Sequence, residues 1–310
     1  MIAFVFPGQG SQKLQMLQEF YAENSVKETF TEASDALGWD VLQLICQDEV
    51  RLNQTEFTQP AILAASVALY RLWIQETGFI PHYLAGHSLG EYTALVVAET
   101  LRFSDALKLV HLRGQLMQKA VPAGQGAMAA ILGLDDQGVI EACREAAQGE
   151  IVAAANFNAP GQVVIAGEVL AVARAMETAK SMGAKRALAL PVSVPSHCLL
   201  MQEAAENLAQ YLESIPVSAP KIPVVHNVDA GLHAEPTDIK KALVQQLDQP
   251  VLWVKCVQTL EALGVNTFVE CGPGKVLTGL NKRISAEGVC FSLEDRAGFL
   301  EGRNATWIKK

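Results

Sequence analysis

The sequence predicts an α/β fold in which a large domain is interrupted by a smaller inserted one. Three observations support this prediction. Short apolar runs that end in glycine or proline alternate with longer stretches of helical periodicity. The order strand, tight turn, helix occurs three times along the chain. Between residues 123 and 196 the order changes to strand, helix, strand, strand, helix, strand, which indicates a separate unit.

The large domain is predicted from its three strand–turn–helix units. Their strands are expected at residues 2–6, 83–85 and 267–270. Their turns are expected at Pro7-Gly8-Gln9-Gly10, Gly86-His87-Ser88-Leu89-Gly90 and Gly272-Pro273-Gly274. The first strand is apolar throughout, as in a strand that is buried on both faces. Another helix is expected over residues 59–76, with Pro60 in its first turn, where proline is tolerated.

The inserted unit lies between Pro122-Ala123-Gly124 and Val194-Pro195-Ser196. Its elements are expected as strands at 127–132, 151–154, 162–166 and 186–192 and helices at 136–147 and 169–182. This βαββαβ order is that of a ferredoxin-like subdomain. We therefore expect residues 1–122 and 197–310 to form one discontinuous catalytic domain, with residues 123–196 as the ferredoxin-like subdomain. The tail after Gly298 carries no readable signal.

Composition excludes several classes of protein. The chain has 310 residues, half of them hydrophobic and 18% charged, which suits a large buried core. A formal net charge of −9 argues against a general nucleic-acid binder. No apolar run approaches the ~18 residues of a membrane helix, and the first residues, MIAFVFPGQGSQ, lack the basic segment of a signal peptide. The six cysteines show no C-x-x-C spacing, so we expect reduced thiols in a cytoplasmic protein without a metal site.

A serine nucleophile is predicted at Ser88. The turn Gly86-His87-Ser88-Leu89-Gly90 fits the pattern G-x-S-x-G, with a strand before it and a helix after it. In such a turn the serine is strained and exposed, while the two glycines let strand and helix pass closely. The N–H of Leu89 would then point at a developing oxyanion. The alternative is an ordinary glycine turn, because this pattern also occurs by chance.

A second oxyanion donor is expected in the turn after the first strand, where Gly8-Gln9-Gly10 could bring a backbone N–H close. A phosphate-binding loop is the alternative, but Gly10 is not followed three residues later by glycine, so the dinucleotide fingerprint fails. Gly274-Lys275 suggests a Walker loop, yet Val269 stands where glycine is required and Val276 where Ser or Thr is required. Both nucleotide-binding interpretations are rejected.

A serine nucleophile needs a general base, and the chain has six histidines. His87 is adjacent to Ser88, so its side chain should point away from that of the serine. His197 lies just after an expected strand, where loop residues meet an α/β active site. His226, in Val224-Val225-His226-Asn227, is the rival candidate. The sequence leaves both open, and a structural role is the alternative for each.

One arginine lies on an apolar helix face. The helix expected from an N-cap at Ser104 to about residue 120 carries a stripe made of Ala106, Val110, Arg113, Met117 and Ala120. A buried guanidinium needs an anionic or multiply hydrogen-bonded partner. Arg113 either snorkels or pairs with an internal carboxylate, or it binds a substrate carboxylate in a bidentate way. Beside a serine nucleophile, the last option favours an acyl donor that carries a free carboxylate.

Together these motifs resemble those of bacterial malonyl-CoA:acyl-carrier-protein transacylases of type II fatty-acid synthesis. Any one motif could arise by chance, but the set is very specific, and it follows the family's order from residue 4 to about 283. The matching motifs are Phe6-Pro7-Gly8-Gln9-Gly10-Ser11-Gln12, Thr58-Gln59-Pro60-Ala61, Gly86-His87-Ser88-Leu89-Gly90-Glu91-Tyr92, Arg113-Gly114, Asn156-Phe157-Asn158-Ala159-Pro160-Gly161-Gln162, Pro195-Ser196-His197-Cys198, Gln246-Leu247 before Pro250-Val251, and Gly272-Pro273-Gly274.

The resemblance implies a role for each matched residue. Ser88 would be the acylated nucleophile, His197 its base and Arg113 the residue that binds the malonyl carboxylate. Leu89 and Gln9 would supply the backbone oxyanion donors.

Three further roles follow from the resemblance. Gln246 would lie where the family orients the histidine through a main-chain carbonyl, in place of the acid of a triad. Gln59 and Asn156 would line the substrate pocket. Selectivity between malonyl and methylmalonyl groups would depend on the pocket volume around Met117, Val194 and Ser196.

The resemblance also implies a fold and an activity. The fold would be an α/β-hydrolase-like domain with a ferredoxin-like insertion. The activity would be ping-pong transfer of malonyl from malonyl-CoA to the phosphopantetheine thiol of acyl carrier protein, through a malonyl-serine. Coenzyme A is then substrate and product, no metal or redox cofactor is implied, and we expect a monomer. Lys185-Arg186 and Lys282-Arg283 are candidate docking sites for an acidic carrier, with a solvated surface as the alternative.

Three other functions remain as alternatives. A free-standing acyltransferase that serves a polyketide synthase would use the same chemistry with another carrier. A serine esterase or thioesterase is disfavoured by Arg113 on the apolar face and by the missing acid of a triad. A catalytically silent carrier-binding protein is disfavoured by the intact Ser88 and His197.

Overall fold

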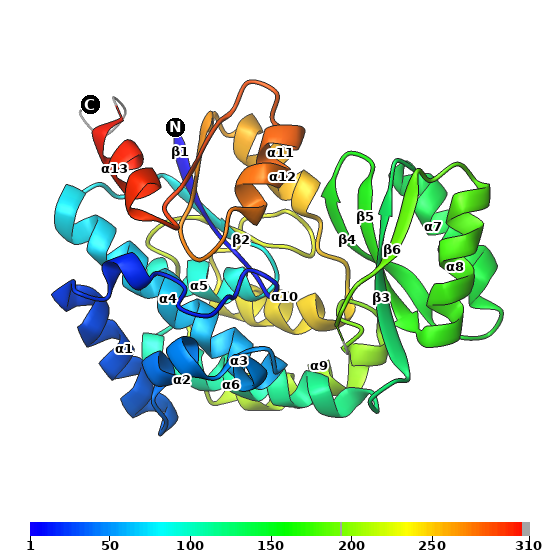
Figure 1. The fold of residues 1–310 in the computed structure, drawn as a ribbon, viewed down its shortest axis with the longest axis horizontal. Coiled ribbons are helices and arrows are strands. Elements are labelled where there is room, and N and C mark those ends of the chain that lie inside the picture. The colour runs from blue at the N-terminus through cyan, green and yellow to red at the C-terminus, as the bar shows by residue number, and fades with distance from the viewer. Residues whose placement is uncertain (193, 306–310) are drawn as a thin grey trace.

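The larger of the two sheets is entirely parallel, with the strand order β7-β2-β1-β8-β9. The computed structural model describes residues 1–192 and 194–305. The strands of this sheet are β1 (Ile2–Phe6), β2 (Tyr83–Gly86), β7 (Val224–Val225), β8 (Thr267–Glu270) and β9 (Val289–Ser292). The strands expected at 2–6, 83–85 and 267–270 are confirmed. Figure 1 shows this sheet in the body of the molecule, with the inserted segment to one side.

Helices cover both faces of the large sheet, and β1 connects the two cores. Phe4 and Phe6 pack into a core with residues of α1, α4, α5, α6, α9 and α10, whereas Ala3 and Val5 pack into a core with α11 and α12. A continuous apolar run therefore does mark a strand buried on both faces. The helices are α1 (Asn24–Leu37), α2 (Val41–Gln47), α3 (Glu49–Leu52), α4 (Thr55–Thr77), α5 (Leu89–Val97), α6 (Phe103–Ala120), α9 (Gln202–Glu213), α10 (Pro236–Asp248), α11 (Trp253–Ala262), α12 (Val276–Ile284) and α13 (Arg296–Asn304).

The inserted segment forms a four-stranded antiparallel sheet of order β4-β5-β3-β6. Its elements are β3 (Gly126–Leu132), α7 (Asp136–Ala147), β4 (Val152–Ala159), β5 (Gln162–Glu168), α8 (Val169–Ser181) and β6 (Arg186–Ala189). Helices α7 and α8 pack on one face of this sheet and lie on the side away from the rest of the molecule. The strand β4 is longer than expected, so the hairpin turn shrinks to Pro160-Gly161, and β6 is shorter.

The small sheet is tied to the large domain along β4. The N–H of Phe157 donates to the carbonyl of Val251 at 3.0 Å, and the N–H of Val251 donates to Ala155 at 2.9 Å. At the turn of the same hairpin, Arg283 of α12 donates to the carbonyl of Pro160 at 2.9 Å and to the side chain of Gln162. Arg283 therefore joins α12 to the β4–β5 hairpin while its side chain stays exposed, and the role of Lys282-Arg283 in carrier docking stays a prediction.

Two expectations about helix starts are wrong. Helix α4 begins at Thr55, so Pro60 lies in its second turn and leaves the carbonyl of Glu56 without its helical donor. The ring N–H (Nδ1) of His111 donates to that carbonyl at 2.8 Å and replaces the lost bond. Helix α6 begins at Phe103 after an extended Arg102, so Ser104 lies inside the first turn and is not the N-cap.

The tail contains a helix that the sequence did not reveal. In α13 the side chain of Asp295 accepts the N–H of Gly298 at 2.8 Å and caps the helix, and Phe299 is buried against Phe20 and Trp73. Residues 306–310 of the expected catalytic domain, and Ser193 of the expected subdomain, lie outside the described residues. In the part of the chain that is described, no helix has the length and apolar character needed to cross a bilayer.

Candidate active site

Ser88 lies at the carboxyl end of β2, in a strained turn that only two glycines allow. Its backbone has φ 52° and ψ −109°, a conformation that is costly for a residue with a side chain. A Cβ on Gly86 would lie 1.9 Å from the carbonyl carbon of Gly90, and a Cβ on Gly90 would lie 2.0 Å from the carbonyl oxygen of Phe6. Strand and helix therefore pass at a distance that no other residue permits, as the G-x-S-x-G pattern predicts.

His197, and not His226, reaches the serine. The Oγ of Ser88 and the Nε2 of His197 are 2.8 Å apart. The other ring nitrogen, Nδ1, donates to the main-chain carbonyl of Gln246 at 2.6 Å. This bond fixes the tautomer, so Nε2 is left as the acceptor of the serine proton. Among the described residues no carboxylate forms an ion pair with His197. The pair is thus oriented by a carbonyl rather than by an acid.

Burial sets the protonation state of His197. Its side chain is 3% exposed, and burial together with the nearby Arg113 charge lowers the pKa of His197 from 6.5 to about 3. The imidazole is therefore neutral at physiological pH, which is the form that can accept a proton. The backbone of His197 has φ 62°, so both members of the pair are held in conformations that the surrounding structure must enforce.

The other histidines near the elbow have structural contacts. The Nε2 of His87 lies 2.8 Å from Asn158 Oδ1 on β4, and its ring packs against Trp253, so it points away from Ser88 as expected. His226 follows β7 and is fully buried, with Nδ1 donating to Glu91 Oε1 at 2.8 Å. Neither ring is in contact with the serine.

Arg113 is a buried cation that is bonded to the nucleophile. It is 1% exposed, on the apolar face of α6 where the sequence placed it. Nη2 donates to Ser88 Oγ at 3.2 Å and to Gln246 Oε1 at 3.0 Å, and Nη1 donates to Gln59 Oε1 at 2.9 Å. Burial lowers its pKa below the usual range. Its guanidinium forms no ion pair within the described residues, so its charge has no carboxylate partner.

The two expected oxyanion donors flank the nucleophile. Leu89 is the first residue of α5, so its N–H has no partner within the helix. The turn that carries Gln9 runs against the elbow, since a Cβ on Gly8 would lie 2.4 Å from the carbonyl oxygen of His87. Within residues 1–192 and 194–305, neither N–H donates a hydrogen bond. The N–H of Ser88 itself is taken, because it donates to Asn227 Oδ1 at 2.7 Å.

The remaining expected residues differ in their contacts. Gln59 is fully buried and contacts both Arg113 and Met117, whose sulfur accepts from Gln59 Nε2 at 3.4 Å. Asn156 is 6% exposed on β4, beside Val251. In the described residues it makes no side-chain hydrogen bond to the serine, histidine or arginine. The structure therefore brings Gln59 to Arg113 and Met117, and the role of Asn156 in the pocket stays a prediction.

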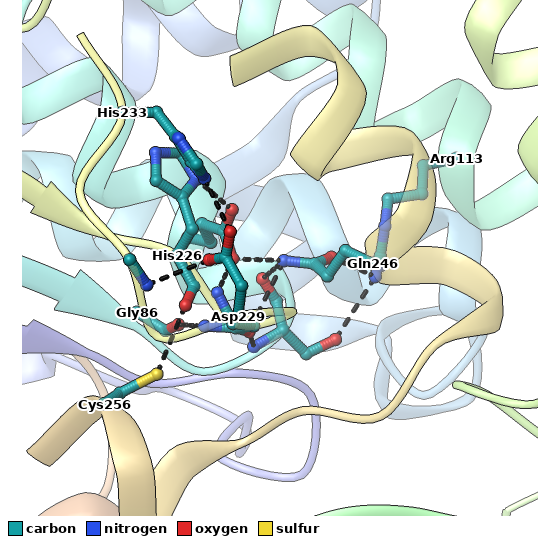
Figure 2. A network of polar contacts seen from close by, with 11 residues as sticks. Gly86, Arg113, His226, Asp229, His233, Gln246 and Cys256 are labelled. Atoms are coloured by element: carbon teal, nitrogen blue, oxygen red, sulfur yellow. Dashed lines mark hydrogen bonds and ion pairs between the residues drawn. The ribbon is translucent and has the colours of Figure 1, made fainter. Parts of the chain in front are cut away.

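A buried polar network beneath the elbow was not predicted. Glu91 accepts the N–H of Asn227 at 2.9 Å and Nε2 of Gln246 at 2.9 Å, in addition to His226. Asn227 in turn donates from Nδ2 to the carbonyl of Gly86 at 2.7 Å. Figure 2 shows how these contacts run from His226 to Gln246 and Arg113. The only sequence signal was position, since Glu91 directly follows Gly90 of the elbow and Asn227 follows His226.

The described cysteines and acidic residues lie apart from one another. All six cysteines are free thiols, as expected. No group of three or more His, Cys, Asp or Glu side chains within residues 1–192 and 194–305 is arranged to hold a metal ion. The chemistry available at the elbow is thus nucleophilic: a serine, a neutral imidazole that can take its proton, free N–H groups and a buried cation.

Comparison with known proteins agrees with this geometry. Residues 3–287 match the family model of the acyl transferase domain. The chain is 57% identical over 284 residues to the malonyl CoA-acyl carrier protein transacylase of Escherichia coli strain K12, covering 91% of this chain and 92% of that protein.

Solved structures agree as well. The acyl carrier protein S-malonyltransferase of Vibrio cholerae superimposes with a TM-score of 0.94 at 54% identity, covering 97% of this chain and 99% of that one. A malonyl-transacylase in complex with a type II PKS acyl-carrier protein gives 0.95 at 52% identity, covering 96% and 97%. The chain belongs to the malonyl CoA-acyl carrier protein transacylase family of acyl transferases.

Proposed function

We propose that this protein transfers malonyl from malonyl-CoA to the phosphopantetheine thiol of an acyl carrier protein, through a malonyl ester of Ser88. The observation that carries the proposal is the buried guanidinium of Arg113, which is bonded to the nucleophile and lacks a carboxylate partner among the described residues. A substrate carboxylate would supply that partner. The acyl transferase family and the names of its relatives support the same reaction.

In the first half-reaction Ser88 Oγ attacks the thioester carbonyl while His197 Nε2 takes its proton. The N–H groups of Leu89 and Gln9 stabilise the oxyanion. The intermediate collapses by breaking the carbon–sulfur bond, and the coenzyme A sulfur leaves with the proton from His197. The carbonyl of Gln246 holds Nδ1 and stabilises the imidazolium as it forms.

Arg113 can bind the malonyl carboxylate while it keeps its contacts with Gln59 and Gln246. Its two terminal nitrogens carry four N–H bonds, of which three are used by Gln59, Gln246 and Ser88 Oγ. When Oγ becomes an ester oxygen, the bond from Nη2 to Oγ is released. One N–H on each terminal nitrogen is then available, which is the fork that binds a carboxylate in a bidentate way. Acylation and carboxylate binding are thus coupled at one nitrogen.

The second half-reaction reverses the first with another thiol. His197 deprotonates the phosphopantetheine thiol, which attacks malonyl-Ser88, and Ser88 leaves with the proton. Water must compete poorly for the ester, and the near-complete burial of Arg113 and His197 limits its access.

The finer architecture belongs to the same proposal. We infer an α/β-hydrolase-like domain over 1–122 and 197–310, because the nucleophile follows a strand of a parallel sheet in a strained elbow. We infer a ferredoxin-like subdomain over 123–196, because its antiparallel sheet places the first strand between the third and the fourth. The proposal includes no metal or redox cofactor, a monomeric enzyme and a cytoplasmic location, with Lys185-Arg186 as a carrier contact.

Steady-state kinetics with malonyl-CoA and a holo carrier protein tests the proposal. Parallel double-reciprocal lines are expected for the ping-pong mechanism, and Ser88→Ala should abolish transfer. One relative is named in complex with a type II PKS carrier, so both kinds of carrier are tested. The carrier with the higher kcat/KM, fatty-acid or polyketide, is the one that the enzyme serves. Hydrolysis of malonyl-CoA that the carrier does not suppress would contradict the proposal and favour a thioesterase.

A further inference from the structure

Glu91 occupies an unusual place for a carboxylate. It lies in the first turn of α5, three residues after the nucleophile, and is fully buried. Its two oxygens accept three hydrogen bonds, from His226 Nδ1, from the N–H of Asn227 and from Gln246 Nε2. None of these donors is a substrate or a reacting atom. Two of the three, Gln246 and Asn227, also contact the catalytic groups.

The first path from Glu91 runs through Gln246 to Arg113. Gln246 Nε2 donates to Glu91 at 2.9 Å, while Oε1 of the same amide accepts from Arg113 Nη2 at 3.0 Å. The same Nε2 also donates to the carbonyl of Ser88 at 3.0 Å, so Glu91 is the charged one of two close acceptors that hold the amide in this orientation. The reversed amide would turn its NH₂ group against the N–H groups of Arg113. Glu91 and the carbonyl of Ser88 together therefore keep the guanidinium in place for a carboxylate, and Glu91 supplies the charge-assisted contact.

The second path runs through Asn227 to the elbow. The side chain of Asn227 accepts the N–H of Ser88 at 2.7 Å and donates to the carbonyl of Gly86 at 2.7 Å, on the two sides of the strained turn. Its own N–H is held by Glu91 at 2.9 Å. A strained backbone persists only where its surroundings enforce it. Glu91 thus supports the conformation of the nucleophile as well.

We propose that Glu91 is a positioning residue of malonyl transfer, which fixes Arg113 through Gln246 and the Ser88 turn through Asn227. The inference rests on the proposed function. It predicts that removing the acceptor at position 91 reduces selectivity for malonyl over acetyl groups, because Arg113 then no longer presents its fork. A residue that served only the stability of the fold would lower the amount of active enzyme and leave this ratio unchanged.

The network also predicts what a conservative variant does. In Glu91→Gln one oxygen can still accept from Asn227 and Gln246, and the new NH₂ group then faces His226 Nδ1. His226 Nε2 has no hydrogen-bond partner in the described structure, so the ring can move its proton from Nδ1 to Nε2 and accept at Nδ1 from the introduced amide. We therefore expect Glu91→Gln to rescue most of the selectivity that Glu91→Met loses.

The experiment measures single-turnover acylation of Ser88 with malonyl-CoA and with acetyl-CoA, by intact-protein mass spectrometry. The malonyl-to-acetyl rate ratio of Glu91→Met should fall by about 10²-fold, the scale of a misplaced catalytic contact. The matched control is Thr29→Val, which removes the side-chain hydrogen bond from a fully buried residue of α1 to the carbonyl of Ser25; Thr29 makes no hydrogen bond to the elbow or to the Glu91 network. Its ratio should equal that of the wild type even if its stability falls.

The kinetics of Asn227→Ala and the ¹⁵N chemical shifts of Glu91→Gln test the inference further. If Glu91→Met does not fold, Asn227→Ala replaces it, and its kcat should fall at least about tenfold with both donors while KM for malonyl-CoA stays constant. In Glu91→Gln, ¹⁵N chemical shifts of His226 should report the Nε2–H tautomer. A folded Glu91→Met with the wild-type malonyl-to-acetyl ratio overturns the inference and leaves the proposed function intact. A folded Asn227→Ala with the wild-type kcat does the same. A wild-type enzyme that does not transfer malonyl overturns the proposed function, and the inference falls with it.

Discussion

Removing the charge of Arg113 while keeping its bulk is the most informative perturbation of the site. Arg113→Met fills much of the same volume on the apolar face of α6 but leaves Gln59, Gln246 and Ser88 without their donor. Malonyl and acetyl differ only in the carboxylate that Arg113 is proposed to bind. The comparison of the two acyl groups therefore isolates that interaction from general damage to the site.

The expected magnitude follows from the two N–H groups that the acylated enzyme leaves for the substrate. Hydrogen bonds to charged groups contribute about 1.5 to 3 kcal/mol each, so two of them contribute roughly 3 to 6 kcal/mol. At about 1.4 kcal/mol per tenfold change, kcat/KM for malonyl-CoA should fall by roughly 10² to 10⁴. Acetyl-CoA has no carboxylate to lose, so its kcat/KM should change by no more than about tenfold.

The assay is quenched-flow acylation with each coenzyme A ester, followed by mass analysis of the intact protein. Arg113→Lys serves as a companion variant, because it keeps a positive charge but not the bidentate fork, and it should recover only part of the lost selectivity. Arg71→Ala, which removes a surface arginine paired with Glu32, is the control for loss of a cation elsewhere. Equal losses for both acyl groups in Arg113→Met would refute the assignment of the carboxylate to Arg113.

Further predictions concern the base, the nucleophile and the link between the sheets. Because burial and Arg113 lower the pKa of His197 to about 3, acylation by acetyl-CoA should be independent of pH down to about pH 5, and Arg113→Met should move the acidic loss of rate to higher pH. Between pH 6.5 and about 3, His197 binds a proton in the unfolded chain but not in the folded protein, so the Tm should fall as the pH drops through this window. If His197→Gln has the same Tm as the wild type at pH 4, this reasoning is contradicted. Ser88→Gly should be more stable than Ser88→Ala by about 1 kcal/mol in denaturant unfolding, because glycine relieves the positive φ, and equal stabilities would show that the turn is not strained. Arg283→Ala should increase hydrogen exchange in the β4–β5 hairpin and leave acylation unchanged; loss of acylation would show that Arg283 acts on the site.

The nucleophile and its glycines could be predicted because their signal is local. The close approaches at Gly86 and Gly90 leave no room for a side chain, so the pattern in the sequence is a direct consequence of the backbone path. The burial of Arg113 was also predictable, because an amphipathic helix shows which residues share its apolar face.

The choice between His197 and His226 could not be made from the sequence. Each follows an expected strand, and the structure places those two strands in different sheets. β7 pairs with β2, which places His226 beside Glu91 under the elbow. His197 follows the inserted segment and is held at the elbow by the carbonyls of Gln246 and Leu247 at the end of α10. Glu91 and Asn227 were missed for the same reason, since they are 136 positions apart in the chain.

Helix boundaries were the other weak point, and the causes are tertiary. The first turn of α4 contains Thr55 and Thr58, polar residues that are buried by neighbouring segments, so hydrophobic periodicity does not reveal it. Helix α13 is short and buries only Phe299 and Gly302, and the ring of Phe299 packs against Phe20 and Trp73 from distant parts of the chain. Neither contact has a signature in the local sequence.

The measurement that tests the central claim most directly is the mass of the intact protein after brief mixing with malonyl-CoA, beside acetyl-CoA and a Ser88→Ala control. The account predicts one malonyl group on the wild type, none on the variant and little acetylation, with the malonyl group removed when holo carrier protein is added. A protein that stays unlabelled while it hydrolyses simple esters, or one labelled equally by both donors, would contradict it.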